Sequence, residues 1–152
     1  MNREAVGEAL KQIIEGYDFD TSKRLVNVKA DVACHVPASC PYSMATNVWH
    51  CDFWNRLWLA RLLGEKRPSG NIYKMDWHVP SAAEWPATKD TFLANIQKAY
   101  EIATAEPFQH AMENDIKAVE KLCQIAVHTA YHVGQIALIK RMAKAELKAA
   151  KE

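Results

Sequence analysis

The chain has 152 residues, of which 49% are hydrophobic and 24% are charged, as is usual for one globular domain spanning residues 1–152. Its 19 basic and 18 acidic residues nearly cancel, which argues against a nucleic-acid-binding surface. The four cysteines form no CxxC pair and no signal peptide is recognisable, so we expect a cytoplasmic protein with reduced thiols. No run of about 18 consecutive apolar residues occurs, so we expect no membrane-spanning segment.

Apolar residues at helical spacing predict a first helix over residues 3–17. Thr21 or Ser22 is suited to cap a second, short helix, which we expect to continue to Val32. The segment 34–42 contains two prolines and is predicted to be a connection.

A strong helix is expected over residues 43–63, where a serine can serve as the N-cap, and Gly64 is suited to end it. Residues 64–86 contain several prolines and glycines and show no clear period, so they predict a long connection. Within this connection, Ser81 and Glu84 have the spacing of a capping box.

Two further long helices are predicted over residues 87–104 and 114–148, the second with Asn114 as its N-cap. No strand pattern or internal repeat accompanies them. Four long amphipathic segments in a chain of this length favour an all-α fold of the four-helix-bundle kind. Such bundles build metal sites from side chains on facing helices.

The segment 123–142 carries His128 and His132, whose spacing places both on one face of a helix, one turn apart. Gln135 lies close to their line. Two hydrogen-bonded core histidines would explain this pattern, since buried polar groups normally have partners. A metal site would also explain it, because the pair presents two imidazoles to one ion, and a third ligand from elsewhere in the chain would strengthen that interpretation. Gly134 is expected to allow close helix packing.

A third histidine, His50, is predicted on the core-facing side of helix 43–63, with Asn47 and Trp54 about one turn to either side. Together with the pair on the last helix, it would supply three neutral imidazoles and leave one coordination position open. That arrangement is typical of catalytic rather than structural zinc sites. We expect Asn47, Trp54 and Gln135 to line or support the site.

The residue after His128 is Thr129, so the pair lacks the glutamate of the HExxH motif, which argues against a metalloprotease. The chemistry would then fall to the ion, which lowers the pKa of a bound water or thiol. Cys51 follows His50 by one step around the helix, and we expect it to be a poor ligand.

The run HTAYHVGQI, residues 128–136, resembles the HxxYHxGQI motif of the DinB/YfiT-like proteins, a family also described as metal-dependent hydrolases. A second match covers that family's second-helix pattern: Trp49-His50, Phe53-Trp54, Trp58-Leu59 and Arg61 to Gly64. A weaker one lies before the third long helix: Asp76-Trp77 and Trp85. The resemblance extends from Pro41 to Met142.

The resemblance implies an up-down-down-up four-helix bundle with a divalent metal, zinc or nickel, on His50, His128 and His132. It also implies a homodimer. Some members of the family transfer low-molecular-weight thiols, such as bacillithiol, mycothiol or glutathione, to electrophiles, so a small-molecule substrate is expected.

Three functions from different classes follow from these patterns. The first is a thiol-dependent transferase, in which the metal holds the thiolate. The second is a hydrolase, in which metal-bound hydroxide is the nucleophile. The third is a non-enzymatic protein that binds a metal or a ligand. The sequence does not separate the first two, because their metal site could be identical.

Overall fold

The computed structural model describes residues 2–67 and 69–152, and within these ranges it contains seven helices and no strand. The four long helices are α1 (Arg3–Glu15), α4 (Met44–Leu63), α6 (Trp85–Thr104) and α7 (Asp115–Ala149). The three short ones are α2 (Ser22–Val26), α3 (Ala30–Cys34) and α5 (Ile72–Met75). The all-α prediction is confirmed.

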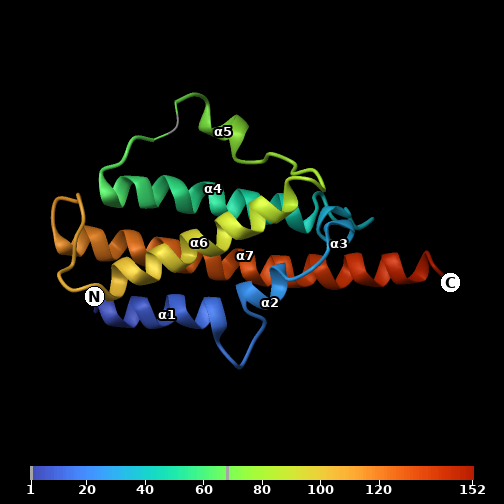
Figure 1. Ribbon diagram of the computed structural model, residues 1–152, viewed down its shortest axis with the longest axis horizontal. Helices are drawn as coiled ribbons and strands as arrows, with labels where there is room; N and C mark the ends of the chain where they lie inside the picture. The colour runs from blue at the N-terminus through green and yellow to red at the C-terminus, as the bar shows by residue number, and fades with distance from the viewer. Residues whose placement is uncertain (1, 68) are drawn as a thin grey trace.

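The long helices lie side by side, and α4 and α7 run in opposite directions (Figure 1). Helix α7 contacts α1, α4 and α6, while α6 contacts α1 and α4. The core between them includes Leu10, Leu62, Phe92 and Ile125, one from each long helix and all fully buried. Antiparallel packing of α4 on α7 brings the middle of one helix beside the middle of the other.

The helix ends follow local sequence signals. The side chain of Ser43 accepts a hydrogen bond from the backbone N–H of Thr46, and Asn114 caps α7 in the same way through Lys117. Gly64 ends α4 in the left-handed conformation, with φ of 69°. The predicted boundaries of the long helices therefore hold within a few residues.

The prediction of a single short helix over residues 21–32 is wrong, because this segment forms two helices, α2 and α3. Asn27 leaves the helical conformation with ψ of 67°. The indole of Trp85 donates to the backbone carbonyl of Val28 at 3.0 Å, and Lys140 donates to two carbonyls at the end of α2. These partners lie far away in sequence and satisfy carbonyls that a continuous helix would use.

The connection 64–86, of which Pro68 lies outside the described residues, contains one turn of helix, α5, that the sequence did not predict. The side chain of Asn71 caps this turn. The predicted capping box is confirmed: the backbone N–H of Ser81 donates to the Glu84 carboxylate at 2.8 Å, and that of Glu84 donates to the Ser81 hydroxyl at 3.3 Å.

Among the described residues, α7 is the one helix long and apolar enough to cross a membrane, judged by length and composition only. In its most apolar window, 44% of the residues are buried within the molecule. It also packs against three other long helices, as a core helix does. The absence of a membrane-spanning segment stays a prediction.

Candidate metal centre

The three predicted histidines lie together at the contact between α4 and α7. His50 comes from α4, and His128 and His132 come from successive turns of α7. One ring nitrogen from each lies within 4.8 Å of the others, so the group could hold a metal ion. The ring centroids are 4.5 Å apart for the α7 pair, and 5.0 and 6.0 Å from His50 to His132 and His128.

A buried hydrogen-bond chain fixes the ring of His132. Its Nδ1 lies 2.9 Å from the side-chain oxygen of Asn47, and the Asn47 amide nitrogen donates to Gln135 at 2.9 Å. Because that oxygen can only accept, Nδ1 carries the hydrogen and Nε2 keeps its lone pair for a ligand. Asn47 is fully buried, so its contact with His132 is shielded from water.

The connection after α5 supplies two neighbours of His50 that the sequence assigned no role in the site. Asp76 places its Oδ2 3.5 Å from Nδ1 of His50, and Trp77 stacks on the imidazole with ring centroids 3.9 Å apart. Trp54 donates its indole N–H to the same Asp76 oxygen at 3.2 Å. Asp76 and Trp77 belong to the weaker part of the family resemblance.

Cys51 and Trp58 flank His128. The Cys51 sulfur lies 3.9 Å from His128 Nδ1, and the Trp58 ring meets the imidazole edge-on at 4.9 Å between centroids. Burial raises the pKa of the Cys51 thiol, which keeps it protonated. Among the described residues, the metal-ligand group consists of histidines and contains no cysteine. That Cys51 is a poor ligand stays a prediction.

The electrostatic surroundings favour neutral imidazoles. Loss of hydration, together with a smaller contribution from neighbouring histidines, lowers the pKa of His132 to about 3 and that of His128 to about 4. The pKa of His50 is also lowered by burial, although the Asp76 charge opposes this shift. All three rings are therefore uncharged near pH 7, the form that binds a metal.

The three predicted support residues all lie beside the cluster, with their polar groups engaged. Asn47 contacts His132 and is itself hydrogen-bonded to Gln135, while the Trp54 indole donates to the Asp76 carboxylate that faces His50. Two buried polar atoms at this place, Nδ1 of His50 and Oδ1 of Asp76, have no hydrogen-bond partner among the described residues. A cation on the far side of His50 would polarise that ring and strengthen its interaction with the carboxylate.

The donor set fits a divalent cation: each of three neutral imidazoles can offer one ring nitrogen to the same ion, and in His132 that nitrogen is Nε2. Comparison with protein-family models, with curated proteins and with solved structures finds no match for this chain.

Proposed function

We propose that this chain is a DinB/YfiT-like four-helix bundle that holds zinc or nickel on His50, His128 and His132 and transfers a low-molecular-weight thiol to an electrophilic small molecule. The convergence of three ligand atoms within 4.8 Å supports the metal part most directly. The choice of a thiol depends on the family resemblance. We further propose that the protein is a cytoplasmic homodimer.

A divalent ion at this place would lower the pKa of a bound thiol or water, making a nucleophile near neutral pH. The protein's own residues hold the site in shape. Asn47 and Gln135 fix the ring of His132, and Asp76 faces His50. Trp77 covers one face of the His50 ring and shields it from water.

A hydrolase is the second candidate, and Asp76 is the observation that favours it. A buried carboxylate with one oxygen unpartnered could accept a proton from a nucleophilic water. However, its other oxygen faces Nδ1 of His50 and accepts the Trp54 N–H, which suits a role in orienting the histidine. The transferase therefore remains the leading proposal.

The test begins with metal analysis of protein purified without affinity resin. The metal-loaded protein is then incubated with an electrophile and each thiol of a panel in turn. His132→Ala should remove most of the metal and the activity. His110→Ala is the matched control, because the His110 side chain is also largely buried and contacts another side chain, Asp115, but lies outside the cluster.

Metal-dependent thiol consumption that is lost in His132→Ala and kept in His110→Ala would support the transferase. Turnover of simple esters or amides without any thiol would favour the hydrolase. If neither reaction exceeds that of His132→Ala with any metal, the binding-protein alternative is correct. Absence of metal from the purified and the reconstituted protein would refute the metal site itself.

A further inference from the structure

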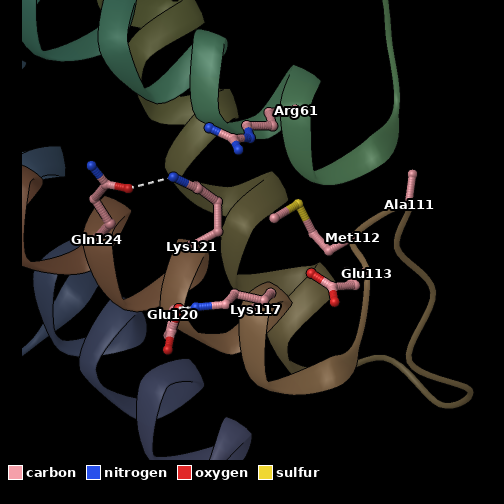
Figure 2. Close-up of a pocket in the computed structure, with 8 residues that line it drawn as sticks. All are labelled: Arg61, Ala111, Met112, Glu113, Lys117, Glu120, Lys121 and Gln124. Atoms are coloured by element: carbon pink, nitrogen blue, oxygen red, sulfur yellow. Dashed lines mark hydrogen bonds and ion pairs between the residues drawn. The ribbon is translucent and has the colours of Figure 1, made fainter.

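A cavity of about 570 Å³ lies between the end of α4 and the beginning of α7. Its charged and polar lining includes three basic residues, two acidic residues and one amide: Arg61, Lys117, Lys121, Glu113, Glu120 and Gln124. Figure 2 shows the Arg61 side chain on α4 and the Lys121 side chain on α7 directed toward the same space. The metal ligands do not line this cavity.

The charges in the cavity are unevenly paired. Lys117 forms an ion pair with Glu120 at 2.8 Å, so these two residues satisfy each other. Among the described residues, neither Arg61 nor Lys121 has a carboxylate within ion-pair distance, and Lys121 donates only to the neutral Gln124 at 2.6 Å. Arg61 and Lys121 therefore face one space without an ion-pair partner of their own, although Glu113 and Glu120 also line the cavity.

Such a pair is unfavourable until an anion neutralises it. Partial burial and the nearby Arg61 charge lower the pKa of Lys121, and the negative charge of Glu120 opposes this shift only in part. A guanidinium and an ammonium together match the oxygens of a carboxylate or a phosphate. We propose that Arg61 and Lys121 bind a carboxylate or phosphate group of a small-molecule ligand in this cavity.

The cavity lies on the same two helices as the histidine cluster, α4 and α7. Arg61 follows His50 by eleven residues on α4, and Lys121 precedes His128 by seven on α7, so each basic residue lies nearly in line with a histidine. The axial separations are about 16 Å and about 10 Å. Trp58 lies between, with its ring 6.0 Å from the Lys121 ammonium and 4.9 Å from His128.

An extended chain of three residues spans about 10 Å. A thiol of that size with a terminal carboxylate would reach both Lys121 and the histidines, so the second part of the proposal is that the cavity selects anionic co-substrates for the metal centre. This part rests on the proposed function. The anion site itself does not, because no metal ligand belongs to it.

The first experiment uses metal-free protein and titrates inorganic phosphate and succinate separately by calorimetry, with NMR to locate the site. We expect saturable binding of at least one anion at one site. Lys121→Gln and Arg61→Gln should each weaken it about tenfold, since each removes a charged hydrogen bond. Lys117→Gln, whose side chain is already paired in the same cavity, should change the affinity less than about twofold.

The second experiment uses zinc-loaded protein and compares glutathione, which has carboxylates, with cysteamine, which has none. Lys121→Gln should weaken binding of glutathione and leave that of cysteamine unchanged. Absence of phosphate and succinate binding, or equal loss in Lys117→Gln and Lys121→Gln, would overturn the anion site. If Lys121→Gln weakens binding of glutathione and cysteamine equally, the anion site does not select co-substrates for the metal centre. A His132→Ala protein that has lost its metal should still bind the anion, so the two failures are distinguishable.

Discussion

Asn47 is the residue through which α4 controls the orientation of a histidine on α7. Its side-chain oxygen accepts from Nδ1 of His132, and its amide nitrogen donates to Gln135 one turn further along α7. Such outer contacts set which ring nitrogen faces a metal and hold the ring still. Asn55, two turns along the same helix, makes a similar buried contact with the Thr129 hydroxyl at 2.9 Å, but no bond to a ligand histidine.

We therefore predict that Asn47→Ala lowers zinc affinity by about 10- to 100-fold, as loss of an outer-shell partner does in known metal sites. Asn55→Ala should leave the affinity nearly unchanged. Each variant should lose about 1–3 kcal/mol of stability, because each leaves a buried polar group unsatisfied. Competition with a chromophoric chelator measures the affinity. Equal losses of affinity in the two variants would contradict the role given to Asn47.

At the scale of the helices, two glycines have opposite roles. Gly64 ends α4 at positive φ, and a Cβ there would lie 2.8 Å from that of Ala111. Gly134 was expected to allow close helix packing, and this prediction is wrong: a Cβ built there meets nothing within 4 Å. Gly134 is simply an exposed glycine within α7, where it lowers helix stability.

We predict that Gly64→Ala destabilises the protein by about 1–2 kcal/mol, because alanine is strained in the left-handed region and would also crowd Ala111. Gly134→Ala should stabilise it by about 0.5–1 kcal/mol, the usual difference between these residues inside a helix. Denaturant unfolding of the metal-free protein measures both changes. A stabilised Gly64→Ala protein would refute the capping role of the glycine.

The long helices could be predicted because caps and apolar periodicity are local signals, as with Ser43 and Asn114. The break between α2 and α3 could not be predicted in this way. The residues that donate hydrogen bonds to its backbone carbonyls, Trp85 and Lys140, lie far away in sequence. The same distinction applies to the site. The histidines follow from helical spacing, whereas Asp76 belongs to a connection without a period, and only packing brings it to His50.

At the scale of the whole molecule, burial of three histidines makes stability depend on pH. Their pKa values are lowered in the folded protein, so below pH about 6.5 the unfolded chain binds more protons than the folded one. Stability contributed by these groups is therefore present above pH about 6.5 and is lost as the pH falls through about 4 for His128 and about 3 for His132. Asp52 acts in the opposite direction, because burial raises its pKa to about 6.

We predict that metal-free protein loses stability between pH 6.5 and pH 4 more steeply than its His128→Gln variant. The contribution of Asp52 is common to both proteins and cancels in this comparison. Urea unfolding at several pH values, with chelator present, measures the two slopes. A wild-type slope equal to or shallower than that of the variant would show that His128 is not buried in its neutral form.

The expected homodimer also belongs to the whole molecule. An apolar cavity of about 500 Å³ lies between α1 and α7, and Phe19 and Val127 on its lining are 51% and 64% exposed. We predict that sedimentation at micromolar concentration gives twice the mass of one chain. Val127→Glu should shift the protein toward the monomer, and Tyr73→Glu, at an exposed aromatic residue on α5, should not. A monomeric wild-type protein would refute the dimer.

The coordination of the ion is tested most directly by X-ray absorption at the zinc edge of protein reconstituted with one equivalent of zinc. We predict a shell of imidazole nitrogens at about 2.0–2.1 Å, with three histidines and no sulfur. His50→Ala, His128→Ala and His132→Ala should each lose bound zinc while remaining folded. A sulfur at about 2.3 Å would instead place Cys51 on the metal. A spectrum with fewer than three imidazoles, or no stoichiometric zinc, would contradict the three-histidine centre.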